Sequence, residues 1–365
     1  MSQLVSQATQ QLRQAVEDAL RKAMAAGELP QADLPEFILE VPGDSAHGDW
    51  ACNAAMAGAR TFHAAPREIA QSIVDHLDLA PTYFEKVEIA GPGFLNFTYR
   101  PAFYAGVLQD IHRLGQAYGR SDAGQGQRVL VEYVSANPTG PMHIGNARGG
   151  VLGDALSAVL EAAGYQVSRE FYINDAGNQV NKYAASLEAR YLQLYQGEEA
   201  VPFPEDGYQG PDVIANAKSF AELYGDKYVN APSEERKAAL IGYALPKNIQ
   251  GLHDDLLRYR VEYDNWFHES TLHENGAVGR VVELLKEKGA TYEKDGATWF
   301  HGEEYGSEDF VLVRSNGVPT YVVPDIAYHY DKLVTRHFDL AIDVLGADHH
   351  GYVPRLKAAL TALGV

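Results

Sequence analysis

The most informative part of the chain is the stretch Val129-Leu-Val-Glu-Tyr-Val-Ser-Ala-Asn-Pro-Thr-Gly-Pro-Met-His-Ile-Gly-Asn-Ala-Arg-Gly-Gly150. Residues Val129 to Val134 are rich in valine, which is typical of a buried parallel strand. Residues Ser135 to Met142 contain two prolines and a glycine and therefore predict a loop. After His143, apolar residues recur with helical spacing, at Ile144, Val151, Leu152, Ala155, Leu156 and Val159. The stretch predicts a strand, a loop and a helix in succession.

A strand followed by a loop and a helix N-terminus is the place where an α/β sheet binds a nucleotide. The unpaired amides and the positive end of the helix dipole face a phosphate there. His143 adds a hydrogen-bond donor, and Gly145 allows a phosphate or a flat ring to approach the backbone. A lone His-x-Gly is more often part of an ordinary strand-to-helix crossover. With Ala136-Asn-Pro-Thr-Gly-Pro141 directly before it, the nucleotide site becomes the better interpretation.

The segment Ser135-Ala-Asn-Pro-Thr-Gly-Pro-Met-His-Ile-Gly-Asn146 resembles the His-x-Gly-His motif region of class I aminoacyl-tRNA synthetases. The lead-in Val131-Glu-Tyr-Val-Ser-Ala-Asn137 and the segment Tyr172-Ile-Asn-Asp-Ala-Gly-Asn-Gln179 resemble the arginyl-tRNA synthetases. One departure is Asn146, which replaces the motif's last histidine and can donate hydrogen bonds but carries no charge. The resemblance implies a Rossmann-like α/β catalytic domain with a parallel sheet and a helical insertion, preceded by a small α+β domain.

Composition fits such a protein with one exception. The 365 residues are 46% hydrophobic and 22% charged, which is usual for a globular protein with two or more domains. No apolar run approaches the ~20 residues needed to span a bilayer. The single cysteine, Cys52, excludes an internal disulfide and fits the cytosol, so we expect a cytoplasmic protein. We also expect a monomer without membrane contact. The net charge of −19 disfavours general nucleic-acid binding, so a tRNA partner would need a local basic surface.

The chain divides into two parts at a polar, glycine-bearing linker. We expect an α+β domain over residues 1–118, a linker over 119–127, and the α/β domain over 128–365 with a connective insertion at about 190–300. In the first part the pattern predicts helices at 4–27, 50–59 (capped by Asp49), 66–77 and after Pro101, and strands at 37–41, 83–90 and 94–99. In the second part it predicts strands at 166–172, 298–301, 310–313, 320–323 and 339–345. It also predicts helices up to Leu194 (capped by Asn174 and Asp175), at 212–229, at 233–259 and from Val353.

Two segments of the first part are candidates for tRNA contact, namely Gly48-Asp-Trp-Ala-Cys-Asn53 and Gly91-Pro-Gly-Phe-Leu-Asn-Phe97. From physics alone they are turns and strand starts. They also resemble the additional N-terminal domain of arginyl-tRNA synthetases, which in the family meets the outer corner of the tRNA. Aromatic residues beside glycine suit stacking on an unpaired base, and they suit a core equally well. On the resemblance we assign tRNA contacts to Asn53, Phe94 and Asn96.

An arginine substrate carries a planar cation with five donors, and its complement is carboxylates placed for forked hydrogen bonds. Glu132 lies in an otherwise apolar strand, so it is either a ligand or part of a buried ion pair, and we favour the ligand. Asp325 follows Pro324 and equally suits the first turn of a helix. The resemblance implies that arginine is held by Glu132, Ser135, Asn137, Tyr321 and Asp325. A site that reads a guanidinium needs no editing domain, and none is recognised here.

The reaction that the resemblance implies is attack of the arginine carboxylate on the α-phosphate of ATP, followed by transfer of arginine to tRNA(Arg). Such phosphoryl chemistry proceeds by positioning and charge stabilisation. We expect His143 to donate to the phosphates, assisted by Asn146. The expected ATP-binding residues are Pro138, Thr139, Gly140, His143, Gly145, Asn146, Gly346, Asp348 and His349. Mg²⁺ would accompany ATP, held largely by its phosphates and by water, and no metal site made by protein side chains is expected.

Two alternatives stay open. Asp348-His-His350 resembles the triplet of DHH-type phosphoesterases, which are metal-dependent, although the Asp-x-Asp that such enzymes carry near an early strand is not found. The chain also shows no Lys-Met-Ser-Lys-Ser motif and no helical anticodon-binding domain before Val365. It is therefore interpreted as the N-terminal portion of an arginyl-tRNA synthetase or as a short relative that serves as a tRNA- or amino-acid-binding module. We expect little aminoacylation by the 365-residue chain.

Overall fold

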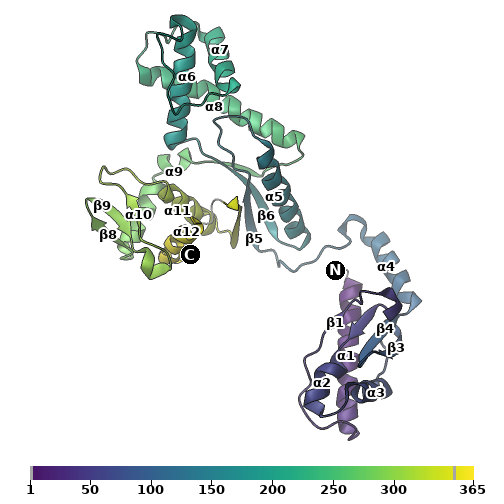
Figure 1. Cartoon of the computed structure of the whole chain (residues 1–365). Coiled ribbons are helices and arrows are strands. Elements are labelled where there is room, and N and C mark those ends of the chain that lie inside the picture. The colour runs from purple at the N-terminus through teal and green to yellow at the C-terminus, as the bar shows by residue number, and fades with distance from the viewer. Residues whose placement is uncertain (1–2, 348–350) are drawn as a thin grey trace. The chain divides into compact units, whose positions relative to one another are not determined.

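The computed structural model describes residues 3–347 and 351–365 (Figure 1). The chain forms two compact units, one ending at Ser121 and the other running from Asp122 to Val365. This boundary lies inside the segment 119–127 that the sequence suggests as a linker. Within the described residues, every helix is too short or too polar to cross a membrane.

The N-terminal unit is an α+β domain around one antiparallel sheet with strand order β1-β2-β4-β3. The strands are β1 (Leu39–Glu40), β2 (Trp50–Cys52), β3 (Phe84–Ala90) and β4 (Phe94–Tyr99), and the helices are α1 (Gln3–Ala25), α2 (Ala54–Phe62), α3 (Pro66–His76) and α4 (Pro101–Leu114). One stripe of α1 is completely buried in the core of this unit, with Ala8, Leu12, Val16, Ala19 and Leu20. The predicted α1, α3, α4, β3 and β4 are confirmed, and β1 is shorter than expected.

The predicted helix at 50–59 is wrong in its first part. Trp50 to Cys52 form a strand that pairs with β1 on one side and β4 on the other, and the helix α2 begins only at Ala54. Asp49 does not cap a helix, because its carboxylate accepts hydrogen bonds from the backbone N–H of Tyr99 and from the hydroxyl of Tyr104. Pairing on both sides buries all three strand residues, which overrides their helical spacing.

The C-terminal unit is built on a parallel sheet with strand order β11-β5-β6-β7. Its strands are β5 (Arg128–Tyr133), β6 (Gln166–Ile173), β7 (Asn265–His268) and β11 (Leu340–Val344), and α5 (Ile144–Ala162) connects β5 to β6. The predicted succession of strand, loop and helix and the α/β fold class are therefore confirmed. The strand β11 lies at the edge of the described sheet and is only half-buried, whereas the sequence suggested a fully buried strand.

The face that α5 turns toward the sheet differs from the predicted one. Gly150, Gly153 and Ser157 are buried, whereas five of the six predicted apolar positions are exposed, namely Ile144, Val151, Leu152, Ala155 and Val159. A Cβ atom at Gly153 would overlap the ring of Tyr133, which ends β5. The large ring projects from the strand into the helix, so only very small residues fit on the side of α5 that meets it.

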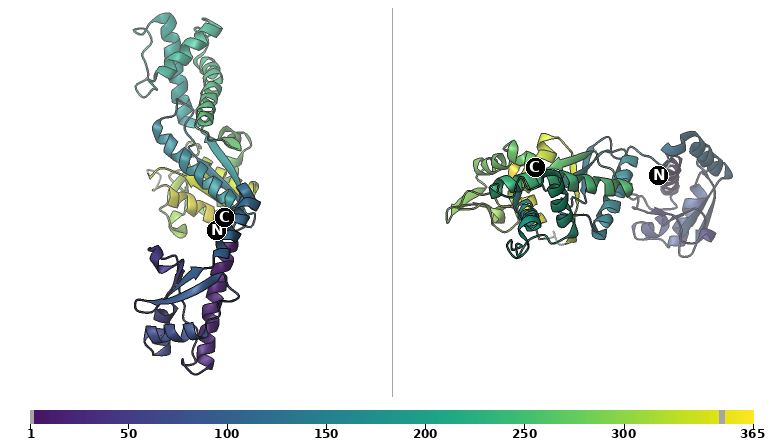
Figure 2. Two further views of the ribbon diagram at one scale, coloured as in Figure 1. Left: turned by 90° about the vertical axis from the view of Figure 1, so that its right-hand side faces the viewer. Right: turned by 90° about the horizontal axis from the view of Figure 1, so that it is seen from above.

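Three helices separate β6 from β7 and have a core of their own (Figure 2). They are α6 (Gly177–Gln196), α7 (Pro211–Tyr224) and α8 (Ser233–Arg258). The parallel sheet resumes at β7. Asn174 and Asp175 do not cap α6, whose N-cap is Ala176. The Asp175 carboxylate instead accepts hydrogen bonds from the backbone and side chain of Ser270.

A second helical and antiparallel layer lies between β7 and β11. It contains α9 (Ser270–Glu274), α10 (Ala277–Glu287), α11 (Val322–Tyr330) and a separate sheet of order β10-β9-β8, with β8 (Thr291–Lys294), β9 (Ala297–Phe300) and β10 (Phe310–Val313). A π-helical turn (Asp331–Thr335) follows α11, and α12 (Val353–Leu363) follows β11. The predicted strand at 320–323 is wrong, because α11 begins at Val322. Thr320 instead bonds back to β10.

Candidate functional site

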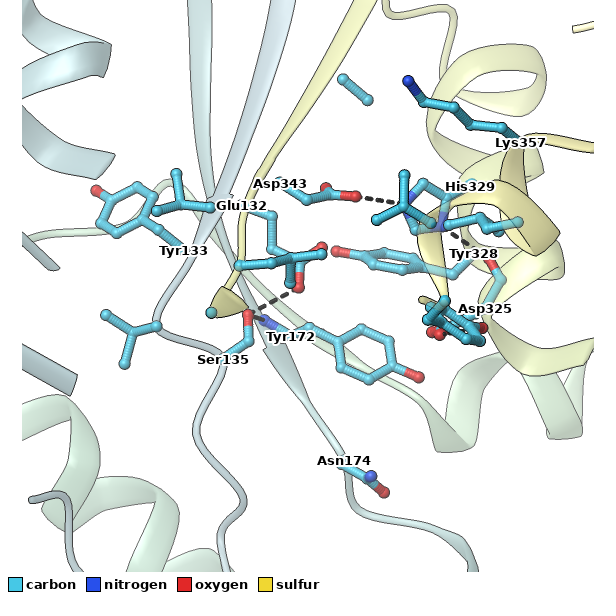
Figure 3. A pocket seen from close by; sticks show the side chains of 18 of the residues that line it. Glu132, Tyr133, Ser135, Tyr172, Asn174, Asp325, Tyr328, His329, Asp343 and Lys357 are labelled. Atoms are coloured by element: carbon cyan, nitrogen blue, oxygen red, sulfur yellow. Dashed lines mark hydrogen bonds and ion pairs between the residues drawn. The ribbon is translucent and has the colours of Figure 1, made fainter. Parts of the chain in front are cut away.

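A cavity of about 620 Å³ opens at the carboxyl ends of β5 and β11, beside the first turn of α11 (Figure 3). It lies where doubly wound sheets bind their ligands. Four of the five residues predicted to hold the amino acid line it, namely Glu132, Ser135, Asn137 and Asp325. The fifth, Tyr321, is largely exposed, and its ring lies 5.8 Å from the ring of Tyr352, which does line the cavity. The structure thus brings together residues from positions 132 and 325, nearly 200 residues apart.

The two residues that follow β5, Val134 (φ 70°) and Ser135 (φ 41°), both have a left-handed backbone conformation. This conformation is costly for a β-branched side chain such as valine, and strained backbone of this kind clusters at functional sites. The turn directs the Ser135 hydroxyl back onto the strand ends. Ser135 Oγ donates to Oε1 of Glu132 at 2.8 Å and accepts from the backbone N–H of Tyr172 at 3.1 Å (Figure 3). One side chain thereby joins the ends of β5 and β6 to the cavity.

Glu132 both lines the cavity and belongs to a buried ion pair, the two possibilities that its position in an apolar strand suggested. Its Oε2 lies 2.6 Å from the ammonium nitrogen of Lys332, which is completely buried. Lys332 also lies 2.8 Å from Oδ1 of Asp343 in β11, and His329 Nε2 lies 2.6 Å from the other oxygen of Asp343. Sequence reasoning missed these three partners. Asp343 carried the same signal as Glu132, a charge inside a predicted apolar strand.

Asp325 presents the other carboxylate of the cavity. It lies in the first turn of α11, and its Oδ2 accepts a hydrogen bond of 2.6 Å from the hydroxyl of Tyr352. Burial raises the pKa of Asp325 above its ordinary value, although the hydrogen bond from Tyr352 opposes this shift. Among the described residues, no group donates to Oδ1 of Asp325. The carboxylate therefore has a free acceptor for a cationic ligand in a site with little water around it.

His143 is the N-cap of α5. Its Nδ1 accepts from the backbone N–H of Gly145 at 3.1 Å, and its own backbone N–H donates to Oδ1 of Asn146 at 3.0 Å. A Cβ atom at Gly145 would overlap the imidazole, so the glycine makes room for the capping ring. In the neutral ring, a nitrogen that accepts leaves the proton on the other nitrogen, so Nε2 is a donor directed away from the helix. The role of His143 as a donor to phosphates stays a prediction.

The loop between β5 and α5 borders a second cavity, of about 430 Å³. Thr139, Gly140, His143 and Asn146 line it, and so do Val134, Ser135 and Asn137, which also line the first cavity. The two cavities therefore adjoin at Val134, Ser135 and Asn137. Pro138 is buried, and its carbonyl accepts from the amide of Asn248 in α8. Gly346 lines the first cavity, whereas Asp348 and His349 lie outside the described residues.

The three candidate tRNA residues lie close together on the sheet of the N-terminal unit. Asn53 follows β2, and β2 pairs with β4, which carries Phe94 and Asn96. Asn96 is 8% exposed, and the amide oxygen of Asn53 accepts from the backbone N–H of Ile38 at 2.8 Å. Asn96 is thus buried in the sheet, whereas Asn53 and Phe94 are half-buried. Their tRNA contacts stay a prediction.

Metal ligation was weighed for Asp348-His-His350, which lies outside the described residues. Within residues 3–347 and 351–365, no cluster of three or more His, Cys, Asp or Glu side chains has the geometry to hold a metal ion.

Two family models match the chain. The model described as arginyl tRNA synthetase N terminal domain matches residues 10–99, and the model described as class I (R) tRNA synthetase catalytic domain matches residues 108–364. The chain belongs to the arginyl-tRNA synthetase family. The arginine–tRNA ligases of Acetivibrio thermocellus and Bacillus subtilis are 50% and 47% identical to it over 100% and 97% of its length. The chain spans about 65% of the length of these curated relatives.

Solved structures of the family share the fold. A structure described as a putative arginyl-tRNA synthetase from Campylobacter jejuni has a TM-score of 0.66 at 34% identity, covering 72% of this chain and 57% of that one. Arginyl-tRNA synthetase of Thermus thermophilus has a TM-score of 0.62 at 22% identity, covering 97% of this chain and 63% of that one. The class I synthetase fold expected from the residues around His143 is confirmed.

Proposed function

We propose that this protein is an arginine–tRNA ligase, which activates L-arginine with ATP and transfers it to tRNA(Arg). The observation that carries the proposal is the junction of two cavities at the Ser135–Asn137 turn. One cavity presents the carboxylates of Glu132 and Asp325, and the other contains the donor of His143. A cationic amino acid and the phosphates of a nucleotide would meet there. The names of the relatives that match the whole chain support the same activity.

The amino-acid cavity suits an arginine in charge and in geometry. A guanidinium is always protonated and has donors in a planar fork, which pairs with a carboxylate through two parallel hydrogen bonds. Asp325 has the free oxygen that such a pairing requires, in a buried site where the interaction is strong. Glu132, Ser135 and Asn137 line the side of this cavity that adjoins the loop before His143, where the amino and carboxylate groups of the substrate would lie.

The reaction needs no protein nucleophile. Arginine's carboxylate attacks the α-phosphate of ATP, and pyrophosphate leaves, with negative charge spread over the phosphate oxygens. His143 Nε2 would donate to these oxygens, and the first amides of α5 with Asn146 would face the same charge. Mg²⁺ would be held by the triphosphate and water. The arginyl-adenylate would then acylate the terminal ribose of tRNA(Arg), whose outer corner we assign to the surface around Phe94. We place the activity in the cytoplasm.

The test is calorimetric titration of the chain with arginine, lysine, citrulline and ATP. We expect arginine to bind, and lysine and citrulline to bind at least about tenfold more weakly. Citrulline lacks the charge and lysine lacks the fork, so each leaves a buried acceptor unpaired. Equal affinity for arginine and citrulline would contradict a pocket that recognises the guanidinium. Arginine-dependent exchange of pyrophosphate into ATP then tests activation itself.

A further inference from the structure

Three carboxylates stand side by side across the middle of the parallel sheet. Asp343 of β11 is the register partner of Glu132 in β5, and Glu132 is the register partner of Glu170 in β6. Partnered residues on parallel strands point to the same face, so all three acids face the layer that contains α11. Glu132 and Glu170 are buried, and Asp343 is nearly so. Adjacent buried carboxylates of like charge would repel one another strongly without cations between them.

Cations for this row come from one segment, the end of α11 and its π-helical turn. Lys332 lies between Glu132 and Asp343, at 2.6 and 2.8 Å. Four residues later, Arg336 forms a forked pair with Glu170, at 2.5 and 2.7 Å. The single turn of π-helix at Asp331–Thr335 contains Lys332, and such turns are frequent at functional sites. The π-helical turn thus places Lys332 against the carboxylates of β5 and β11, and Arg336 against the carboxylate of β6.

The two cations differ in what they touch. Glu170, the partner of Arg336, is completely buried and does not line the cavity. Glu132 and Asp343, the partners of Lys332, do line it (Figure 3). Lys332 itself is completely buried below them, with its ammonium 4.0 Å from the centre of the Tyr328 ring. Lys332 is therefore unable to touch a ligand in the cavity, whereas both of its partners can.

We propose that Lys332 is a positioning residue for arginine recognition, acting through Glu132. Its ammonium fixes Oε2 of Glu132 while Ser135 fixes Oε1, so the carboxylate faces the cavity in one orientation. This proposal rests on the proposed function, because it takes arginine as the ligand of the cavity.

The electrostatic balance supports this role. Burial alone would lower the pKa of Lys332, but the charges of Glu132 and Asp343 raise it above its ordinary value. Burial likewise tends to raise the pKa of Asp343, but Lys332 and His329 hold it well below its usual range. Lys332 and Asp343 thus keep each other charged. Without the ammonium, Glu132 would face the like charge of Asp343 on the neighbouring strand and would turn away from it.

The experiment is a double-mutant cycle on arginine affinity, measured by titration calorimetry on the whole chain. The variants are Glu132→Gln, Lys332→Met and the combination of both, with ATP affinity as the internal reference. Glu170→Gln is the matched control, because it removes a charge from the same row and Glu170 does not itself line the cavity. We expect Lys332→Met and Glu132→Gln each to weaken arginine by about tenfold or more, and ATP affinity to stay unchanged. Glu170→Gln should keep the arginine affinity of the unchanged chain.

The decisive comparison is between Glu132→Gln and the double variant. If Lys332 acts through Glu132, the double variant binds arginine no more weakly than Glu132→Gln alone. This comparison also holds if Lys332→Met fails to fold, because the double variant removes one positive and one negative charge together. A further tenfold loss in the double variant, or unchanged affinity in Lys332→Met, would overturn the proposal. Absence of arginine binding in the unchanged chain would instead overturn the proposed function, before any variant is considered.

Discussion

The imidazole Nδ1 of His143 accepts a hydrogen bond of 3.1 Å from the backbone N–H of Gly145. This contact gives the histidine two separate tasks. Nδ1 caps the first turn of α5, and the cap places the ring proton on Nε2, where it can donate to a ligand. The family's His-x-Gly spacing thus has a structural reason, because the glycine supplies the N–H and leaves space for the ring.

The two tasks of His143 can be separated by mutation. His143→Ala removes both the cap and the donor, so we expect a loss of about 1 kcal/mol of stability and adenylate formation slower by about 10²–10³-fold. His143→Asn keeps a side chain that caps helices well but lacks a donor at the position of Nε2. It should therefore retain the melting temperature of the unchanged chain and lose the rate. Pyrophosphate exchange and thermal unfolding measure the two effects, and an unchanged rate in both variants would remove His143 from the mechanism.

Glu132 is predicted to act on the amino acid and not on the nucleotide. Its carboxylate lines the cavity that contains Asp325, whereas it is absent from the lining of the cavity around His143. We expect Glu132→Gln to weaken arginine by about tenfold or more with ATP affinity nearly unchanged. Ser135→Ala is a useful companion, because it removes only the hydrogen bond to Oε1 and should give a smaller loss in the same direction. Equal losses for arginine and ATP would contradict the assignment.

Much of the fold could be predicted because its signals are local. The valine-rich β5, the prolines of the following loop and the start of α5 at His143 each have a distinct pattern over a few residues. The errors arose where contacts with residues distant in the sequence determine the local structure. Trp50 to Cys52 form a strand because β1 and β4 lie on either side, and Asp175 leaves its expected cap for Ser270. The residues within segments 50–59 and 174–194 do not by themselves indicate those partners.

The site shows the same limit. Glu132 was identified as a charge within an apolar strand, and Asp325 through the family resemblance. Both line the cavity. Lys332 was missed because a lysine in a helical segment is ordinarily exposed, and only the π-helical turn takes it into the core. The apolar side of α5 was expected to pack on the sheet but is exposed, for a related reason. Periodicity shows that a helix has an apolar face, but the ring of Tyr133 selects the glycine face for the sheet.

The contact between α5 and β5 predicts opposite effects for two neighbouring glycines. A methyl group at Gly153 would overlap the buried ring of Tyr133, and such overpacking costs about 1–3 kcal/mol. At Gly149 the nearest atom to an added Cβ lies 3.9 Å away, so alanine fits there and favours the helix by up to about 1 kcal/mol. We expect the melting temperature to fall for Gly153→Ala and to hold or rise for Gly149→Ala. The reverse order would show that the helix does not close on Tyr133 in this way.

Asp325 is predicted to make arginine binding and folding stability depend on pH in opposite directions. Burial raises the pKa of Asp325 above 3.8, so the folded chain holds this proton more tightly than the unfolded chain does. As pH rises through the window between the unfolded and the folded pKa, the proton is lost and stability falls. Arginine needs the ionised carboxylate, so its affinity increases over the same window, by up to about tenfold per pH unit.

Two variants test this coupling at Asp325. Asp325→Asn should weaken arginine by at least about tenfold at neutral pH and melt at a higher temperature there, because it removes a buried charge. Tyr352→Phe removes the hydroxyl that donates to Oδ2, so it should raise the pKa further and move the midpoint of arginine binding to higher pH. Calorimetric titrations across a pH series give both midpoints. A Tyr352→Phe midpoint at lower pH, or an Asp325→Asn variant that keeps full arginine affinity, would exclude Asp325 as the partner of the guanidinium.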